Sequence, residues 1–393
     1  MRVVQTVFGV FHHFELARQM QERGHLERIY STWPWARLRR EGIQRALVRT
    51  FPWIHLPETL MQRTGFDVTP ITDALGYANA LSFDWFTDRE LGKTAAPDAL
   101  VAISGSSLQT GLHLQARGTC FICDRGSSHQ RYQEAIVSAE FRRWGVDRAV
   151  SDPRDTAREE RIYEVADAIT VPSSFAARSF VESGVPGEKV HVVPYGVRLE
   201  RFRRTGEPPG TVFQVLFAGA VGLRKGFPYL LEAFSRLRHP AKVLRVAGAM
   251  QPEMREVLGR LPQEHVEFLG AVSQDRLADL MSTSHAMVLP SVEEGLALVQ
   301  GQALACGCPV IATTNTGAED LFTDGLEGYI LPVGDAEAIA DRLQMLADDP
   351  ALQQRLSEAA LRRVHLLGGW TDYGDRWERL LWELTGALPP PTN

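Results

Sequence analysis

The residues with the clearest chemical potential lie in the range 290–317, after a short apolar strand that ends at Leu289. A turn there leads into a helix that is almost wholly apolar, which indicates that the helix is buried. The first turn of such a helix carries free backbone N–H groups, here those of Gly295, Leu296 and Ala297. Together with the positive end of the helix dipole, these groups favour an anion, and a pyrophosphate is the natural ligand.

Two polar side chains flank this predicted anion site. Glu294 stands at the mouth of the helix, and Gln302 lies two turns further on. Eight helical residues span about 12 Å at about 1.5 Å each. That length is close to the separation of the sugar and ribose ends of a nucleotide sugar folded over its diphosphate. The spacing therefore suits a ligand with hydroxyl groups on both sides of a diphosphate.

A second stretch with chemical potential covers residues 217–226, with the sequence FAGAVGLRKG. It reads as a strand, a turn at Gly219 and the start of a helix that follows Arg224 and Lys225. A cation at the start of a helix sits unfavourably against the helix dipole. We therefore expect Arg224 and Lys225 to bind a diphosphate and to offset the charge that develops on a leaving nucleotide. The alternative is that both side chains are solvated at an ordinary helix start.

The first half of the chain offers candidates in CDRGSSH, residues 123–129, directly after a predicted strand. We expect Asp124 to position an acceptor hydroxyl or to stabilise positive charge on a sugar ring. We expect His129 to contact acceptor or sugar hydroxyls. The competing interpretations are an ordinary turn aspartate and a structural histidine. Gly9, at the end of the first strand, would let the backbone approach a donor phosphate closely.

Alternating strands and helices position all of these residues. Short apolar strands followed by amphipathic helices repeat from Arg2 to Val193, a charged linker follows at 198–210, and the alternation then restarts. Such alternation predicts an α/β protein with parallel sheets covered on both faces. We expect two Rossmann-like domains facing a cleft, residues 1–197 and 198–368, and a C-terminal helix at 369–388 that crosses back to the first. Ligands bind at the carboxyl ends of parallel strands, so the cleft is the expected site.

These stretches resemble the retaining GT-B glycosyltransferases of family four. The signature of that family reads Glu-Gly-Phe-Gly, with a second Glu seven intervening residues after the first, and then Ala-x-Ala-Cys-Gly-x-Pro-Val-Ile. Glu294 matches the first Glu, and Gln302 stands at the place of the second. The Arg-Lys-Gly run at 224–226 matches the segment that opens the family's second domain, where Ala220 replaces an arginine. The resemblance is good from about residue 167 onward and looser before it.

The resemblance implies the GT-B fold and the retaining transfer of a hexose-type sugar from a UDP- or GDP-sugar to a glycan, lipid-linked or small-molecule acceptor. Glu294 would hydrogen-bond the donor sugar, Gln302 would hold the ribose, and Lys225 with Arg224 would bind the diphosphate. The reaction would be a same-face substitution in which the departing diphosphate takes the acceptor proton. Because no Asp-x-Asp motif is present, we expect neither a metal nor a cofactor. The base, the sugar and the acceptor stay open.

Composition narrows the choice of partners and compartment. The 393 residues carry a net charge of −6, and the pI is about 6.0, which argues against a general nucleic-acid binder. No apolar run approaches the roughly 18 to 20 residues of a membrane span, and the first strand does not read as a signal peptide. We therefore expect a cytoplasmic protein. The four cysteines form two close pairs in predicted core elements, where we expect buried thiols rather than a zinc site.

Residues 33–60 depart from the alternating pattern, because aromatic and basic side chains interleave there. These side chains are Trp33, Trp35, Phe51 and Trp53 with Arg37, Arg39, Arg40, Arg45 and Arg49. The segment could be a peripheral membrane contact, with arginines meeting lipid phosphates and tryptophans entering the interface. It could equally be a helical insertion whose aromatic side chains pack onto the first domain. Both interpretations are left open.

Three other functions compete with sugar transfer. A nicotinamide-dependent dehydrogenase shares the architecture, but no Gly-x-Gly-x-x-Gly motif follows the first strand. A nucleotide-sugar epimerase of GT-B architecture would use the same diphosphate site but would act on one substrate alone. A non-catalytic homologue that binds a nucleotide sugar or a membrane would bind nucleotide without turnover, and Gln302 and Ala220 are the substitutions that would mark it.

Overall fold

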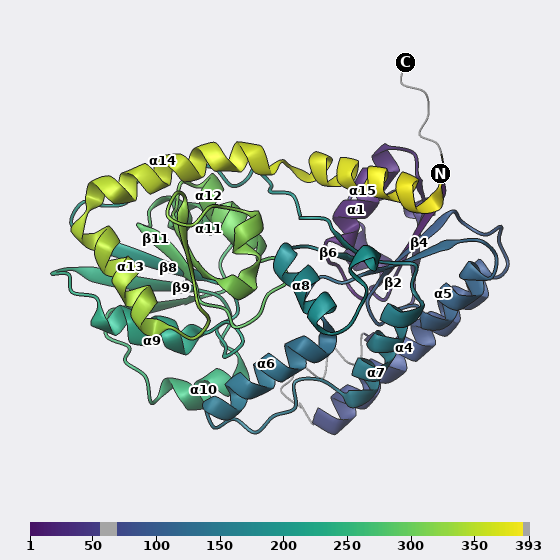
Figure 1. Cartoon of the computed structure of the whole chain (residues 1–393), viewed down its shortest axis with the longest axis horizontal. Coiled ribbons are helices and arrows are strands. Elements are labelled where there is room, and N and C mark those ends of the chain that lie inside the picture. The colour runs from purple at the N-terminus through teal and green to yellow at the C-terminus, as the bar shows by residue number, and fades with distance from the viewer. Residues whose placement is uncertain (56–68, 388–393) are drawn as a thin grey trace, which may run out of the picture.

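The computed structural model describes residues 1–55 and 69–387 of the chain. Within these residues, two parallel β-sheets form the centres of two lobes, which lie side by side in Figure 1. Helices cover the sheets, as the alternation of strands and helices requires. The predicted pair of Rossmann-like domains is therefore confirmed.

The first sheet has seven strands in the order β3-β2-β1-β4-β5-β6-β7. These strands are β1 (Val3–Val7), β2 (Leu26–Ser31), β3 (Val48–Thr50), β4 (Ala99–Ile103), β5 (Cys120–Asp124), β6 (Ala168–Val171) and β7 (Val190–Val192). The helices of this lobe are α1 (His13–Glu22), α2 (Trp35–Leu38), α4 (Thr69–Leu91), α5 (Leu108–Gln115), α6 (Gln130–Arg143), α7 (Pro153–Val165) and α8 (Ser174–Glu182), with short 3-10 turns η1 (Arg45–Leu47) and η2 (Gly187–Lys189). The strand order reverses between β1 and β4, which makes their carboxyl ends a favoured ligand site.

The second sheet has six strands in the order β10-β9-β8-β11-β12-β13. These strands are β8 (Phe213–Ala218), β9 (Lys242–Ala247), β10 (Val266–Gly270), β11 (Ala286–Leu289), β12 (Val310–Thr313) and β13 (Gly328–Leu331). The remaining helices are α9 (Phe227–Arg236), α10 (Pro252–Leu258), α11 (Gln274–Ser282), α12 (Leu298–Ala305), α13 (Ala336–Asp348), α14 (Pro350–Leu367) and α15 (Trp370–Thr385), with 3-10 turns η3 (Thr314–Thr316) and η4 (Ala318–Asp320). Here the order reverses between β8 and β11, so the loops after these two strands meet.

The C-terminal helix returns to the first lobe, as predicted. In Figure 1, α14 runs along the second lobe, and α15 lies over α1 of the first. Trp377 of α15 is fully buried in this contact, and His25 pairs with Glu378 at 2.6 Å. The first sheet ends at β7 and the second begins at β8, so the domain boundary predicted at 197 and 198 falls in the connection between them and stays a prediction.

Helix α6 belongs to the first lobe in sequence but packs against the second. Its Val137 and Phe141 are buried in the core cluster that contains the strands and helices of the second lobe. On the same helix, Glu140 accepts a hydrogen bond of 2.8 Å from the hydroxyl of Tyr229 in α9. The two lobes are therefore joined by a buried apolar contact as well as by the crossing of the chain.

The described part of the arginine- and tryptophan-rich segment is not mainly helical. Only α2 and the 3-10 turn η1 are helical there, and β3 extends the edge of the first sheet. The phenyl ring of Phe51 stacks on Phe86 at 4.8 Å, whereas Trp53 is 75% exposed. Residues 56–60 of the segment lie outside the described residues. Among the helices of the described residues, none combines the length and the apolar character needed to cross a membrane.

Candidate active site

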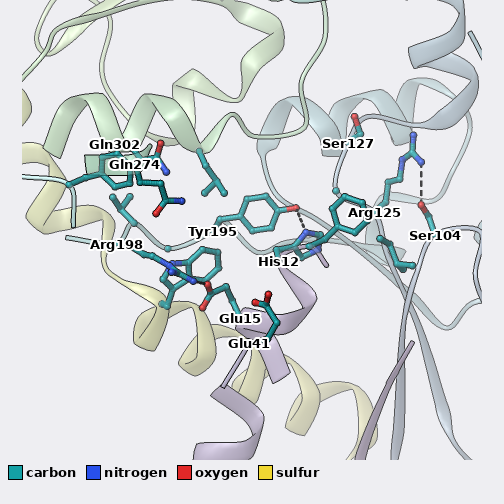
Figure 2. A pocket seen from close by; sticks show the side chains of 18 of the residues that line it. His12, Glu15, Glu41, Ser104, Arg125, Ser127, Tyr195, Arg198, Gln274 and Gln302 are labelled. Atoms are coloured by element: carbon teal, nitrogen blue, oxygen red, sulfur yellow. Dashed lines mark hydrogen bonds and ion pairs between the residues drawn. The ribbon is translucent and has the colours of Figure 1, made fainter. Parts of the chain in front are cut away.

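A cavity of about 760 Å³ lies between the two lobes (Figure 2). Residues that follow β1, β4 and β5 line it from the first lobe, and residues of α12 and of the loop after β8 line it from the second. The connection at 195–198 forms a further wall. A neighbouring cavity of about 570 Å³ shares Gln133 and Arg224 with the first. The interdomain cleft expected from the sequence is therefore present.

The mouth of α12 differs from the prediction in one respect. The helix begins at Leu298, two residues later than expected, and Ala297 is its N-cap in an extended conformation. The N–H of Ala297 donates to the carbonyl of Thr316 in the loop after β12, at 3.3 Å, so it is not free for a ligand. Within the described residues, the N–H groups of Gly295 and Leu296 have no hydrogen-bond partner. Two of the three predicted donors therefore remain available.

Gly295 is the point at which the two lobes meet backbone to backbone. A Cβ atom at this position would lie 2.1 Å from the carbonyl oxygen of Gly126 in the loop after β5. The hydroxyl of Ser173, also from the first lobe, donates to the Gly295 carbonyl. No side chain other than that of glycine fits here, and the mouth of α12 therefore faces the first lobe directly.

The structure brings together Arg224, Lys225 and Glu294, three of the predicted site residues. Lys225 forms an ion pair with Glu294, and the Arg224 guanidinium lies 3.8 Å from the same carboxylate. They meet because β8 and β11 are neighbours where the strand order of the second sheet reverses. Burial lowers the pKa of Lys225, and the charge of Arg224 acts in the same direction. An anion placed between Arg224 and Lys225 would favour the charged form of Lys225, because it would offset both the burial and the repulsion from Arg224.

Glu293 is a site residue that the sequence reasoning missed. Its carboxylate is fully buried and accepts hydrogen bonds from Ser127 (2.6 Å), Ser128 (2.7 Å) and Gln133 (2.8 Å) of the first lobe. It also accepts one from Arg224 at 3.0 Å. Burial alone would raise the pKa of Glu293, but the Arg224 charge and the serine hydrogen bonds outweigh it and lower the pKa. The two adjacent glutamates in the sequence were the available signal.

Asp124 lies at the end of β5, as predicted, but beneath the cavity wall. Its Oδ2 accepts a hydrogen bond of 2.8 Å from His12, and its Oδ1 accepts one of 2.9 Å from Thr170. The register of β5 with β6 sets Thr170 directly opposite. His12, which sequence reasoning also missed, lines the cavity in front of the carboxylate. Asp124 therefore contacts the cleft only through His12. His12 lies in the loop after β1, and the Phe-His-His run at 11–13 was the sequence signal that could have identified it.

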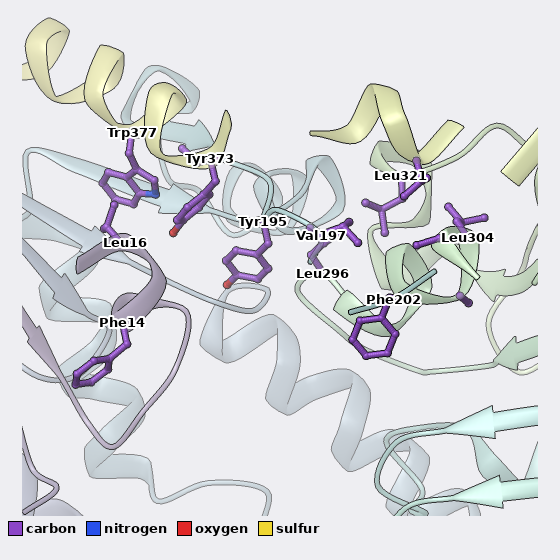
Figure 3. Close-up of a cluster of buried hydrophobic side chains, with 14 of the residues drawn as sticks. Phe14, Leu16, Tyr195, Val197, Phe202, Leu296, Leu304, Leu321, Tyr373 and Trp377 are labelled. Atoms are coloured by element: carbon purple, nitrogen blue, oxygen red, sulfur yellow. The ribbon is translucent and has the colours of Figure 1, made fainter. Parts of the chain in front are cut away.

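His12 is in turn held by the connection between the lobes. The Tyr195 hydroxyl lies 3.1 Å from His12 Nδ1. The Tyr195 ring packs beside Tyr373 of α15, with ring centroids 6.1 Å apart, and Figure 3 shows both in the cluster of apolar side chains that joins the lobes. Tyr195 thus links the connection between the lobes to the loop after β1.

The structure places His129 away from the interlobe cavity, and its contact with a substrate stays a prediction. The side chain is buried, and its ring packs between Tyr163 and Phe180, at 5.0 Å from each, away from the interlobe cavity. His129 is the N-cap residue of α6, and its N–H donates to the Ser179 hydroxyl at 2.9 Å. That backbone direction sends the ring into the first lobe. Burial lowers the pKa of His129 to about 4 and keeps the ring neutral.

The remaining predicted residues take different positions. Gly9 has a positive φ of 71°, and a Cβ there would lie 2.8 Å from the Trp33 indole nitrogen, so glycine is required at this position. The approach of its backbone to a donor phosphate stays a prediction. Gly219 directly follows β8, and a Cβ there would lie 3.9 Å from Lys225 Cε. Gln302 lines the cavity, and among the described residues its side-chain amide has no hydrogen-bond partner. Gln302 is therefore available to a ligand, and its ribose role stays a prediction.

Among the described residues, one group has the spacing that a metal ion needs. His12, His13 and Asp124 offer ligand atoms within 4.8 Å of one another. Hydrogen bonds to Asp124 and Tyr195 already engage both nitrogens of His12, while His13 lies 3.4 Å from the same carboxylate. Burial lowers the pKa of His13 to about 3, so its ring is neutral. The expectation of a metal-free site stays a prediction.

Two family models match the chain in succession. The glycosyl transferase 4-like domain matches residues 12–196, and the glycosyl transferases group 1 model matches residues 200–363. The second match contains the Arg-Lys and Glu-Glu pairs, and the first contains the His12, Asp124 and Tyr195 contacts. The division between the two models falls in the connection between the sheets.

Curated relatives carry glycosyltransferase names. A D-inositol 3-phosphate glycosyltransferase of Streptomyces bingchenggensis is 32% identical over 244 residues, which are 55% of this chain and 53% of that protein. An alpha-D-kanosaminyltransferase of Streptomyces kanamyceticus is 28% identical over 193 residues, 45% of this chain and 50% of that protein. The chain thus spans about half the length of the curated relatives that it matches.

Solved structures share the arrangement of the whole chain. A sucrose-phosphate synthase from Thermosynechococcus elongatus has a TM-score of 0.72 at 20% identity and covers 99% of this chain and 100% of its own. Alr3699/HepE from Anabaena, in complex with UDP and glucose, has a TM-score of 0.68 at 14% identity, with 98% and 100% covered. These likenesses show the fold. Two successive family models, two parallel sheets with a returning helix and this shared architecture together establish that the chain belongs to the group 1 glycosyl transferases and has the GT-B fold.

Proposed function

We propose that this chain transfers a hexose-type sugar from a UDP- or GDP-sugar to a hydroxyl group of a glycan, lipid-linked or small-molecule acceptor. The transfer proceeds with retention and without a metal ion. The observation that carries the proposal is the pairing of Lys225 and Arg224 with Glu294 and Glu293 where the strand order of the second sheet reverses. A desolvated lysine and a partly exposed arginine, both held by carboxylates beside unbonded N–H groups, form a site for a diphosphate.

The donor fits this arrangement end to end. The diphosphate displaces Glu294 from Lys225 and accepts hydrogen bonds from the N–H groups of Gly295 and Leu296. Glu294, released from the cation, then accepts hydrogen bonds from the sugar hydroxyls. The Gln302 amide lies further along α12 and bonds the ribose. The Arg224 and Lys225 charges do here what a divalent cation does in other transferases.

The reaction is a substitution on one face of the sugar. The bond between the anomeric carbon and the diphosphate oxygen breaks, and its electron pair stays with the nucleotide. The acceptor oxygen forms the new bond from the same side, which conserves the anomeric configuration. Positioning by the two lobes and the field of Arg224 and Lys225 supply the catalysis.

The named ligands of similar proteins support the donor class. The Anabaena structure holds UDP and glucose, and a Staphylococcus aureus TarM structure, with a TM-score of 0.54, holds UDP together with alpha-GlcNAc-glycerol. Among the relatives, the D-inositol 3-phosphate glycosyltransferase is named for an inositol phosphate, whereas the alpha-D-kanosaminyltransferase is named only for the sugar that it transfers. The acceptor of this chain therefore stays open within the hydroxyl class.

A thermal-shift screen with UDP, GDP, ADP and dTDP, each with and without EDTA, tests the proposal. A ligand that binds only the folded state at a hundredfold excess over its Kd stabilises by about 2.7 kcal/mol. We expect one uridine or guanosine nucleotide to raise the melting temperature equally with and without EDTA. The corresponding nucleotide sugar should then release nucleotide and form a glycoside. Conversion of the donor into an isomeric nucleotide sugar instead would identify an epimerase.

Lys225→Ala provides the residue-level test of the same proposal. Because the ammonium group offsets charge on the leaving diphosphate, we expect turnover to fall by about 10²-fold or more, with the fold intact by circular dichroism. Lys93→Ala is the matched control, since Lys93 lies on the surface in a pair with Glu90. Equal rates for the two variants would remove Lys225 from the site.

The segment at 33–60 supports a peripheral membrane contact as part of this proposal. Trp53 is 75% exposed, and Arg39 and Arg40, earlier in the same segment, are also exposed. Residues 56–60 are outside the described part. We expect the protein to sediment with vesicles that contain anionic lipid, and Trp53→Ser to weaken that binding. Equal recovery of both proteins in the supernatant would favour a small, freely diffusing acceptor.

A further inference from the structure

Three hydrogen-bonded side chains connect the interior of the first lobe with the cleft. Asp124 Oδ2 lies 2.8 Å from His12 Nε2, and His12 Nδ1 lies 3.1 Å from the Tyr195 hydroxyl. Asp124 is 4% exposed and does not line the cavity, whereas His12 and Tyr195 do. Figure 2 shows the Tyr195 hydroxyl directed at the His12 ring. The line thus begins at a buried carboxylate and ends at a cleft-lining hydroxyl.

The direction of each hydrogen bond follows from the chemistry of the groups. An ionised carboxylate only accepts, so a neutral His12 must carry its proton on Nε2 and donate it to Asp124. That tautomer leaves Nδ1 as an acceptor, and the Tyr195 O–H donates to it. The Tyr195 oxygen keeps its lone pairs for a hydroxyl in the cleft. Burial raises the pKa of Tyr195 well above its usual value, so the group passes a proton as a phenol and not as a phenolate.

The end of this line lies beside the proposed donor site. A Cβ on Gly126 would lie 3.1 Å from the Tyr195 hydroxyl and 3.2 Å from His12 Cε1. The carbonyl of Gly126 is the atom against which Gly295 packs, and Gly295 follows Glu294. Tyr195 and His12 therefore face the cavity just across the lobe boundary from the mouth of α12.

The other carboxylates that line the cavity are already paired. Glu15 forms ion pairs with Arg18 and Arg198, and Glu41 lies 3.2 Å from Arg37. An ion-paired carboxylate is a weak base. Among the described residues that line this cavity, His12 is the one histidine, and its ring is hydrogen-bonded to a buried carboxylate.

We propose that Tyr195 is a catalytic residue that takes the proton of the acceptor hydroxyl and passes its own proton to His12, with Asp124 as the positioning residue. This inference rests on the proposed sugar transfer. As the acceptor oxygen bonds to the anomeric carbon, its proton moves to the Tyr195 oxygen, and the Tyr195 proton moves to His12 Nδ1. The electron pair of the broken bond leaves with the diphosphate. Asp124 stabilises the resulting imidazolium, which later returns the proton to water.

The groups that face His12 come from three elements. Asp124 belongs to β5, His13 to α1 and Tyr195 to the connection between the lobes. Tyr373 of α15 packs behind Tyr195. A phenylalanine at 195 keeps the ring in this cluster and removes only the hydroxyl, so Tyr195→Phe breaks the line without opening a cavity. Tyr373→Phe is the matched control, because it removes a hydroxyl from the same cluster and leaves the line whole.

The experiment compares two nucleophiles, water and azide, with UDP-glucose and GDP-glucose as donors. Water must lose a proton to form its bond, and azide has none to lose. We expect Tyr195→Phe and His12→Asn to slow donor hydrolysis by about 10²-fold or more, while glycosyl azide forms within about threefold of the wild-type rate. Tyr373→Phe should match the wild type with both nucleophiles.

Each other result has a definite meaning. If hydrolysis and azide transfer fall together in Tyr195→Phe, the tyrosine acts on structure or donor binding and the relay is overturned. If neither falls, the departing diphosphate takes the proton and the relay is also overturned. Loss of wild-type hydrolysis in EDTA would make His12 and Asp124 metal ligands and overturn it as well. A wild-type protein that transfers glucose to neither nucleophile and binds no nucleotide refutes the proposed function itself.

Discussion

Adjacent residues in this site do different work because their backbone directions differ. Glu293 and Glu294 are neighbours, yet Glu293 points into the first lobe and accepts hydrogen bonds from two serines, while Glu294 pairs with Lys225 beside the cavity. Sequence reasoning selected Glu294 from its place at the helix mouth. It gave Glu293 no role, since the partners of Glu293 lie about 165 residues earlier. A pattern within one segment carries no record of such a distant contact.

His129 lends itself to a test by pH, because it is buried as a neutral ring. An unfolded histidine titrates near pH 6.5, and burial lowers the folded pKa of His129 to about 4. Between these values the unfolded chain binds the extra proton, so this residue makes stability fall as the pH drops from about 6.5 to about 4. Below about 4 both states are protonated, and the contribution changes no further.

Urea unfolding at a series of pH values measures this effect. We expect His129→Gln to lower stability at pH 7 through lost packing but to flatten the acid decline, by at most about 1.4 kcal/mol per pH unit. His113→Gln is the control, since His113 is an exposed partner of Asp88. Parallel pH profiles for the wild type and His129→Gln would mean that His129 already titrates as a free histidine.

At the scale of elements, the sequence predicted whether a segment is a helix or a strand better than it predicted where that segment begins and ends. Strand and helix alternation located both sheets and the returning helix α15, because apolar periodicity reports burial directly. It placed the start of α12 at Leu296, two residues early, since it could not include the hydrogen bond from Ala297 to Thr316 in the next loop. It also missed β2, and it missed β3 and β13, which are edge strands of the two sheets. Ends and edges depend on partners that local patterns do not contain.

Helix α6 is the element that couples the lobes most directly. Its first half follows the loop of Asp124, and its second half buries Phe141 in the core of the second lobe. Removing a large buried side chain destabilises by about 3 to 5 kcal/mol. We therefore expect Phe141→Ala to lower the melting temperature and to split the calorimetric transition, because the lobes would then unfold separately.

Leu366→Ala is the control for this change, because Leu366 is a large apolar residue that is 77% exposed. Its melting curve should match that of the wild type. A single transition for Phe141→Ala, at the temperature of the control, would show that α15 and the chain crossings hold the lobes together without α6.

At the scale of the molecule, the two lobes contact each other beside the cavity, and the proposed function requires both. The polar contacts between them include the buried Glu293 cluster and the exposed pair of Arg178 with Glu319 at 2.6 Å. Glu293 and Glu319 therefore allow a buried and an exposed carboxylate of the same interface to be compared. A buried, multiply bonded carboxylate is costly to alter because its partners are left unpaired, whereas an exposed ion pair contributes at most about 1 kcal/mol.

Glu293→Gln keeps the shape of the side chain but replaces one of its two acceptor oxygens with a donor nitrogen. Glu293 Oε2 receives hydrogen bonds from Gln133 and Arg224, so an amide nitrogen in that place would face two donors, and the Arg224 charge would lose a partner. We expect the variant to bind nucleotide within a few-fold of the wild type but to turn over about tenfold or more slowly. With nucleotide bound, the radius of gyration of the variant, measured by small-angle scattering, should be larger than that of the wild type. Glu319→Gln should change neither quantity, since its pair is solvated. If Glu293→Gln stays as compact and as active as the wild type, the lobes close through α6 and Gly295 alone, and the buried carboxylate serves only to keep Arg224 in place.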